Sequence, residues 1–250
     1  MAERAKVASP YPLVSASQIT NFDRESEGCA RKWGFKSLLK LEEAQGTAAA
    51  LGDDIDTGQL QPYLTEGRAL DFTRRSGDIA ASAISLIPPK QTPGLSCQHH
   101  IMMPTFEGPG AGTDGALFGY QGYLDFYHET SVVMPNYLDP EGLAHLTRAA
   151  VEERLGRTIP LVGDFKSTGA WKWRKTPTSL KTDVQATIYA KWAMWKRHVD
   201  VVDLSWVYMR TKESPKAQRS DLRTTLATVS YTHLRAHETK ANLVCRLLLE

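Results

Sequence analysis

The chain has 250 residues, of which 42% are hydrophobic and 23% charged, an ordinary globular composition that supports one domain with a full core. It contains no apolar run as long as a membrane span, and its net charge of +2 confines any nucleic-acid-binding surface to a local patch. The N-terminal residues lack the apolar segment of a secretory signal and the cysteines lack C-x-x-C spacing, so we expect a cytoplasmic protein.

Ser15 and Gln18 have the spacing of a capping box at the start of a helix. The helix that we expect after them has an apolar side and a basic side, and the basic side includes Arg31 and Lys32. This basic side is either the solvated face of an amphipathic helix or part of a groove for a phosphate backbone.

Residues 51–64 predict the next helix, although Gly52 and Gly58 weaken it. Three acidic residues crowd one of its turns: Asp53, Asp54 and Asp56. Their mutual repulsion is explained either by a nearby cation or by the positive end of the helix dipole.

Residues 76–87 predict a further helix that ends before two prolines. Residues 97–103 then predict a strand, in which the adjacent His99 and His100 point to opposite faces and are interpreted as structural. The glycine-rich stretch at 107–115 lacks the Lys-Ser/Thr ending of a phosphate loop, so we expect a hairpin turn.

Two strands each carry an aspartate among apolar neighbours. Residues 122–127 contain Asp125, and residues 159–166 place Asp164 and Lys166 on one face, about 6–7 Å apart along the strand. A buried carboxylate needs a cation nearby, and such a pair can bind a divalent ion together with an anionic oxygen. A solvated Asp-x-Lys face is the alternative. Residues 134–157 predict an insertion between the two strands.

The stretch 168–181 interleaves basic side chains with tryptophans and has no acidic residue. Its distinctive residues are Trp171, Lys172, Trp173, Arg174 and Lys175. This composition suits neutralisation of a DNA backbone combined with base stacking on single strands. Alternatively, it is a loop whose tryptophans pack down onto the protein.

The helix that begins near Asp183 places Gln185 and Tyr189 on one face. It also carries an apolar stripe that includes Trp192 and Trp195, which we expect in the core. Residues 201–210 predict the final strand.

These residues, in this order, resemble the PD-(D/E)XK nuclease superfamily, and within it the RecB-like exonuclease branch. The resemblance rests on Asp125, on Asp164-Phe165-Lys166 and on Gln185-x-x-x-Tyr189, with weaker support from Ser15–Ile19 and Cys29–Trp33, and it spans roughly residues 15–210. The branch carries G-x-x-x-H on its first core helix, where this chain has Gly52-Asp53-Asp54-Ile55-Asp56. Asp56 therefore stands in place of a histidine, a change that favours Mg²⁺ over Mn²⁺.

The resemblance implies an α/β fold with a restriction-endonuclease-like core, in which helices flank a central mixed β-sheet over residues 1–228. It implies metal-dependent hydrolysis of DNA by an exonuclease that acts in recombination, repair or phage DNA processing, in a bacterial or phage-encoded setting. The implied catalytic residues are Asp125, Asp164, Lys166, Gln185 and Tyr189. The implied ligands of Mg²⁺, or of Mn²⁺ as the alternative ion, are Asp56, Asp125, Asp164 and the carbonyl of Phe165. The expected DNA contacts are Arg31, Lys32, Trp171, Lys172, Arg174 and Lys175. A helicase or recombination protein is the expected protein partner.

Some RecB-like nucleases hold an iron–sulfur cluster with four cysteines, one near the N-terminus, as Cys29 is, and three near the C-terminus. This chain has three cysteines in all and cannot build that cluster as written. Residues 229–250 resemble a translated sequencing adaptor, so we expect them to be a non-native tail.

Two other functions fit the same residues. One is a catalytically inactive nuclease fold that binds DNA or assists a helicase, which the aspartate at position 56 favours. The other is a metalloenzyme or structural protein without a nucleic-acid role. Metal-dependent DNA cleavage and the salt dependence of DNA binding separate the three.

Overall fold

A computed structural model provides the structure and describes residues 13–22, 46–104, 119–130 and 159–225. The chain divides into two compact units. The first comprises Met1–Leu41, Ile101–Gly122 and Tyr231–Glu250, and the second comprises Glu42–His100 and Tyr123–Ser230. Across the described ranges, none of the helices has both the length and the apolar character needed to cross a membrane.

Several predictions concern residues outside these ranges. They are the basic pair Arg31 and Lys32, the glycine-rich turn at 107–115, the insertion at 134–157 and the tail at 229–250.

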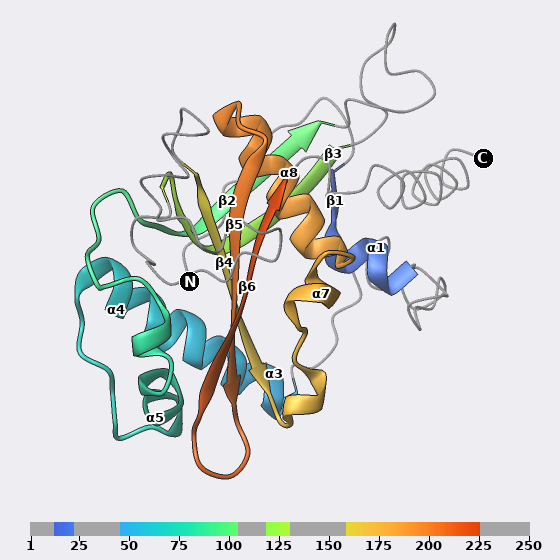
Figure 1. The fold of residues 1–250 in the computed structure, drawn as a ribbon. Coiled ribbons are helices and arrows are strands. Elements are labelled where there is room, and N and C mark those ends of the chain that lie inside the picture. Colours follow the sequence, from blue (N-terminus) through green and yellow to red (C-terminus); the bar gives the residue numbers. More distant parts are fainter. Residues whose placement is uncertain (1–12, 23–45, 105–118, 131–158, 226–250) are drawn as a thin grey trace, which may run out of the picture. The chain divides into compact units, whose positions relative to one another are not determined.

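The strands belong to a mixed six-stranded sheet (Figure 1). They are β1 Leu13–Ser15, β2 Ser96–Pro104, β3 Gly119–His128, β4 Leu161–Thr168, β5 Val201–Arg210 and β6 Ala217–Thr225. Their order is β1-β3-β4-β5-β6, and β2 also pairs with β3. The β4–β5 pair is parallel, whereas β3–β4 and β5–β6 are antiparallel. The predicted α/β class, with a central mixed sheet flanked by helices, is confirmed.

In the first unit, β1 lies parallel to the first residues of β3 and leads directly into helix α1, Ala16–Phe22. The predicted capping box is present here. The backbone N–H of Gln18 donates to Ser15 Oγ at 3.3 Å, and Gln18 Oε1 accepts from the backbone N–H of Ser15 at 2.8 Å. Two N–H groups at the helix start are thereby satisfied.

In the second unit, the helix predicted over residues 51–64 runs from Thr47 to Glu66 in three parts. These are α3 Thr47–Asp53, the π-helix η3 Asp54–Leu60 and α4 Gln61–Glu66. The predicted helix is present, but its middle part, η3, is π-helical. Glycine is favoured at position 58 of this segment, because a Cβ there would meet the carboxylate of Asp54, which also binds Arg74 at 2.9 Å. π-Helical turns are rare and occur often at functional sites.

The helix predicted over residues 76–87 is also interrupted. It consists of α5 Arg75–Ala81 and the 3₁₀ turn η4 Ile84–Leu86. The prolines that follow prevent its continuation.

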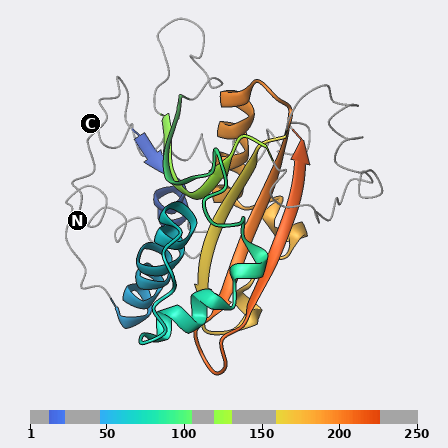
Figure 2. The same ribbon diagram turned by 90° about the vertical axis from the view of Figure 1, so that its left-hand side faces the viewer.

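These helices cover one face of the sheet, and Figure 2 shows α3 and α4 beside the strands. Ile55, Leu60, Leu64 and Ile79 from the helical side pack with Phe126, Leu161, Phe165, Val207 and Met209 from the strands. Burying each large aliphatic side chain contributes about 1.5–3 kcal/mol.

Helix α8, Val184–Arg197, contacts β4 and β5 through the other face of the sheet. Asp183 caps its start by accepting the backbone N–H of Ala186 at 2.9 Å. Trp192 is buried as predicted, but Trp195 is 40% exposed, so the expectation that both lie in the core is wrong for Trp195. Trp195 lies in the last turn of the helix, where the apolar stripe runs off the sheet.

The prediction that β5 is the final strand is wrong, since β6 follows it and pairs along its length. The sequence of β6 is polar, but its charges are compensated inside the sheet. Arg223 of β6 makes a bidentate ion pair with Asp203 of β5 at 2.6 and 2.8 Å. Paired charges of this kind are tolerated in a buried strand, where unpaired ones are not.

Candidate active site

Strand β4 places an acid and an amine side by side, as predicted. Asp164 is 1% exposed, and Lys166 Nζ lies 2.5 Å from its Oδ2 atom. The Lys166 side chain remains 38% exposed, and its ammonium neutralises a buried carboxylate. Both residues lie on the face of the sheet that α8 covers, because Asp164 is in register with Trp206, which packs against Tyr189 of α8.

Strand β3 brings Asp125 to the same place. The β3–β4 ladder includes the pair Phe126 and Gly163. Next to this pair, the Asp125 side chain replaces a backbone carbonyl as the acceptor of a β4 N–H group. Its Oδ2 atom accepts the backbone N–H of Phe165 at 2.6 Å. The N–H and C=O of one strand residue point to the same neighbour, so the Phe165 carbonyl lies on the Asp125 side of β4.

The π-helix η3 supplies the third acid, Asp56. Gln61 Nε2 donates to its Oδ1 atom at 3.0 Å, and Gln98 Nε2 of β2 donates to its Oδ2 atom at 3.1 Å. The same Gln98 nitrogen donates to Asp125 Oδ1 at 3.2 Å. Gln98 therefore links Asp56 to Asp125. We call Asp56, Asp125 and Asp164 together the acid cluster.

Helix α8 orients the acid cluster through Gln185 and Tyr189. Gln185 Nε2 donates to Asp164 Oδ1 at 2.8 Å and to Tyr189 Oη at 2.9 Å. The Tyr189 hydroxyl donates in turn to the backbone carbonyl of Tyr123 at 2.8 Å. The two side chains thus lie on one face, as the i and i+4 spacing predicts, and they connect β4 to β3 through α8.

Burial and mutual repulsion disfavour the charged forms of these acids. Burial raises the pKa of Asp125 well above its ordinary value, and Asp164 and Asp56 raise it further. Burial raises the pKa of Asp56 to about 6, against the lowering influence of the Gln61 hydrogen bond, and Asp164 adds to the increase. Burial also raises the pKa of Asp164, although Lys166 opposes that increase. Among the described residues, these three acids lie near one another, and the Lys166 ammonium contacts Asp164.

Lys166 stays protonated in this environment. Burial alone would lower the pKa of its ammonium, but the carboxylates of Asp164 and Asp125 outweigh that effect and hold the pKa above its ordinary value. Lys166 is therefore suited to stabilise negative charge and unsuited to accept a proton at neutral pH.

Within the described residues, no group of three or more His, Cys, Asp and Glu side chains is arranged around a single point as a metal site. The Gln98 amide lies between Asp56 and Asp125, and the Lys166 ammonium contacts Asp164. By chemistry, however, the acid cluster fits Mg²⁺. Its donors are carboxylate oxygens, and a divalent cation would offset the repulsion that contributes to the raised pKa of Asp56 and Asp125.

The basic segment after β4 is ordered by its own contacts. It contains the 3₁₀ turn η6 Trp171–Trp173 and the short helix α7 Pro177–Leu180. Lys175 makes an ion pair with Asp183, and Arg174 Nη1 donates to Ser220 Oγ at 3.4 Å. Thus Arg174 and Lys175, two of the four residues of this segment predicted to contact DNA, contact other parts of the protein.

Lys172 and the neighbouring Trp173 face solvent. Trp173 is 70% exposed, and Lys172 is exposed with its Nζ atom 5.0 Å from the centre of the Trp173 ring. The alternative in which both tryptophans pack down is wrong for Trp173. Trp171, by contrast, is half-buried and lies 5.8 Å from the Arg210 guanidinium.

Gln61 and Gln98 are the two residues of the site that the sequence did not identify. Both are neutral and belong to none of the motifs. The only local signal was the position of Gln61, five residues after Asp56 on the same helical stretch.

No protein-family model matches this chain, and no curated protein matches it. Among solved structures, the chain is similar to one described as "Crystal structure of SSO0001". The two share 12% sequence identity with a TM-score of 0.47, over 94% of this chain and 79% of the other.

Proposed function

We propose that this chain is a Mg²⁺-dependent deoxyribonuclease that hydrolyses phosphodiester bonds of DNA. One observation carries the proposal: three carboxylates from a π-helix and two strands converge with one lysine ammonium. Burial raises the pKa of all three acids, and the other acids of the cluster raise the pKa of Asp125 and Asp56 further, as is common where ionisable groups are gathered for catalysis or metal binding.

The residues of the acid cluster would hold the cation, with the Phe165 carbonyl as a further oxygen ligand. When bound there, Mg²⁺ would supply Lewis-acid polarisation of a phosphoryl oxygen and a lower pKa for bound water. The ammonium of Lys166 offsets the negative charge that develops on the phosphoryl group. Gln185 and Tyr189 act as positioning residues, since Gln185 donates a hydrogen bond to Asp164 rather than contacting Lys166.

The residue types at the site suit backbone chemistry more than base recognition. Phosphate contacts position a nucleic acid without reading its sequence, so we expect low sequence specificity. The resemblance favours an exonuclease that acts in recombination, repair or phage DNA processing, with Mn²⁺ as an alternative ion.

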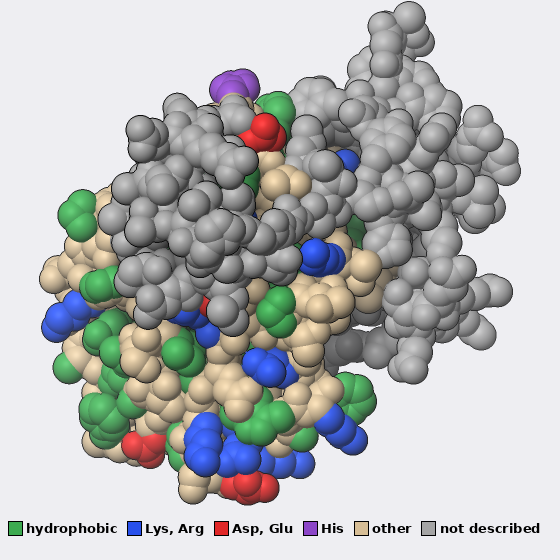
Figure 3. All heavy atoms as spheres, in the orientation of Figure 1, with side chains coloured by type: hydrophobic (Ala, Val, Ile, Leu, Met, Phe, Trp, Pro, Cys, Tyr) green, Lys and Arg blue, Asp and Glu red, His purple; other side chains and the backbone are tan. Residues whose placement is uncertain are grey.

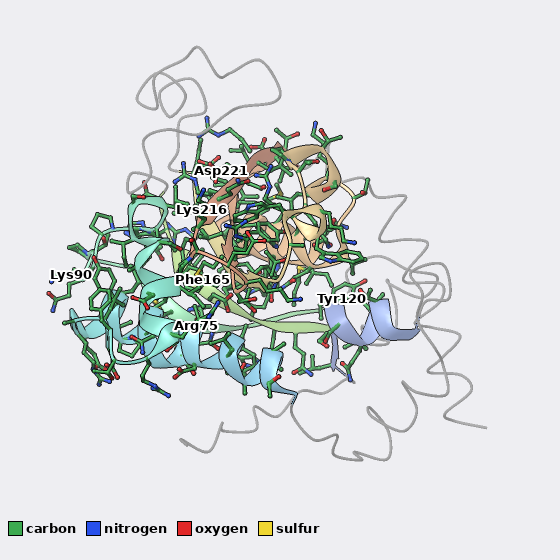
Figure 4. The ribbon with its side chains drawn as sticks, turned by 90° about the horizontal axis from the view of Figure 1, so that it is seen from below. Arg75, Lys90, Tyr120, Phe165, Lys216 and Asp221 are labelled. Carbon is green, nitrogen blue, oxygen red and sulfur yellow. The ribbon has the colours of Figure 1, made fainter. Side chains whose placement is uncertain are left out.

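The test compares cleavage of linear single- and double-stranded DNA with Mg²⁺, Mn²⁺ or EDTA. Lys166→Ala and Asp164→Asn should each lower the cleavage rate by at least about 100-fold, while DNA binding stays largely intact. Lys90→Ala is the matched control, because Lys90 is exposed and lies well apart from Phe165 (Figure 4). It should cleave like the wild type.

A wild-type protein that binds DNA but shows no cation-dependent cleavage would instead support the DNA-binding or helicase-accessory function. A protein that does neither, at low as well as moderate salt, would contradict both functions.

A further inference from the structure

Gln98 occupies a central place in the site although no motif includes it. Its Nε2 atom lies 3.1 Å from Asp56 Oδ2 and 3.2 Å from Asp125 Oδ1. An amide nitrogen carries two N–H bonds, so it can donate one to each acid. These acids come from η3 and β3, and Gln98 itself comes from β2, so one amide joins three elements.

The backbone of Gln98 is in an unfavourable conformation that serves this contact. Its φ angle is +48° within β2, a left-handed value that non-glycine residues adopt at a cost of order 1–3 kcal/mol. The flanking residues pack elsewhere. Cys97 packs against the hydrophobic core, and the centre of the His99 ring lies 5.2 Å from that of Trp192 in a tilted contact. At Gln98, therefore, the side chains of β2 cease to alternate regularly between the two faces of the sheet, and the Gln98 amide reaches the two acids.

The chemistry of an amide suits two states of such a site. In the absence of a cation, N–H groups stabilise two carboxylates that would otherwise repel each other. A half-turn of the terminal amide torsion, which is broad in glutamine, exchanges the nitrogen for an oxygen at the same place. That oxygen is a ligand type that Mg²⁺ and Mn²⁺ accept.

We propose that Gln98 is a positioning residue of the acid cluster. It holds Asp56 and Asp125 at a common separation and turns its amide oxygen toward a divalent cation when one binds. This inference rests on the proposed function, because it assumes that the acid cluster binds a cation.

The test measures Mn²⁺ binding to the full chain by titration calorimetry, without DNA. Gln98→Gly removes the amide but favours the left-handed backbone, and we expect it to weaken Mn²⁺ binding about 10-fold. Gln98→Glu adds a fourth carboxylate, and we expect it to tighten binding about 10-fold.

Gln91 provides matched controls, because it is also a non-glycine residue with positive φ, +56°, and its Nε2 atom donates to the backbone carbonyl of Glu66. Gln91→Gly and Gln91→Glu should leave Mn²⁺ affinity unchanged. Circular dichroism checks that each variant folds, and if Gln98→Gly does not fold, Gln98→Glu decides the outcome.

The possible failures are distinguishable. If wild-type protein does not bind Mn²⁺, or if Asp164→Asn binds it as tightly as the wild type, the cation site and the proposed function are both wrong. If Asp164→Asn loses binding while the Gln98 variants bind like the wild type, only the role of Gln98 is wrong.

Discussion

The carboxyl group of Asp56 loses its proton at a higher pH in the folded protein than in the unfolded chain. Its pKa rises from 3.8 to about 6 on folding. The folded state therefore binds more protons between these values, and the free energy of unfolding falls as pH rises through them. Below pH 3.8 Asp56 is protonated in both states, and its destabilising effect is complete above about pH 6.

We predict that the metal-free protein is less stable at pH 7.5 than at pH 4.5. Asp56→Asn should recover about 1–3 kcal/mol of that loss, because the amide does not ionise. Urea unfolding in EDTA at the two pH values measures the difference. Asp78→Asn, at an exposed position of α5, is the control. Equal pH dependence in wild type and Asp56→Asn would contradict the prediction.

Two buried tyrosines, Tyr189 and Tyr127, differ in the hydrogen bonds of their hydroxyl groups. The Tyr189 hydroxyl accepts from Gln185 and donates to the Tyr123 carbonyl. The Tyr127 hydroxyl is buried and has no hydrogen-bond partner among the described residues. Net stabilisation by a hydroxyl depends on whether its hydrogen bonds are made.

We therefore expect Tyr189→Phe to lower the free energy of unfolding by about 0.5–1.5 kcal/mol and to reduce cleavage, while Tyr127→Phe is neutral or stabilising. Denaturant unfolding and the cleavage rate of both variants test this. A loss in Tyr127→Phe as large as that in Tyr189→Phe would contradict this prediction, because it would show that the Tyr127 hydroxyl also contributes to stability.

At the scale of elements, the site depends on how closely β3 and β4 approach. Gly163 of β4 lies opposite Phe126 of β3, and a Cβ at Gly163 would overlap the Phe126 ring. The Phe126 ring packs 5.2 Å from that of Phe165 within the hydrophobic core. Any displacement there moves Asp125 relative to Asp164.

Gly163→Ala should therefore lower the free energy of unfolding by about 1–3 kcal/mol and lower cleavage with it. Gly169→Ala is the matched control, since a Cβ at Gly169 meets only the flexible side chain of Lys212 at 3.4 Å. The measurements are denaturant unfolding and cleavage rate. If Gly163→Ala has the same free energy of unfolding and cleavage rate as the wild type, β3 and β4 can move apart without loss of stability, and the prediction is wrong.

The elements also show what the sequence could predict. Asp164 with Lys166, and Gln185 with Tyr189, are pairs within one strand or one helix, so their spacing alone predicts a shared face. Asp125 was identifiable as an acid among apolar neighbours. The π-helix at Asp56 and the left-handed backbone at Gln98 were not predictable, because both depend on contacts between elements distant in sequence. Strand β6 was missed because its sequence is polar and the contacts that compensate its charges form only in the folded sheet. There Arg223 pairs with Asp203 of β5, and Asp221 accepts from Ser205 of β5 and pairs with Arg219.

At the scale of the whole molecule, the net charge is only +2, so any basic surface must be local. The acid cluster is buried, whereas Lys and Arg side chains gather on the surface in the lower part of the view in Figure 3. In Figure 1 the turn between β5 and β6 occupies that region. A DNA backbone would thus meet local basic groups, and its affinity should depend on salt through a few contacts.

Lys172 and Trp173 allow the electrostatic and stacking parts of that affinity to be separated. Lys172→Ala should weaken binding of single- and double-stranded DNA alike and reduce the slope of log affinity against log salt by about 1. Trp173→Ala should weaken single-stranded DNA binding by about 1–3 kcal/mol through lost base stacking, with an unchanged slope. Fluorescence anisotropy at several salt concentrations measures both.

Lys90→Ala and Phe72→Ala are the controls for the lost lysine and the lost exposed aromatic ring, because Lys90 is exposed and Phe72 is 64% exposed. Neither belongs to the basic segment, so both should bind like the wild type. If Trp173→Ala changes the salt slope, or if Phe72→Ala weakens binding as much, the stacking role of Trp173 is wrong. The path of DNA would then have to be assigned to other basic side chains, among which Lys212 and Lys216 at the β5–β6 turn are exposed.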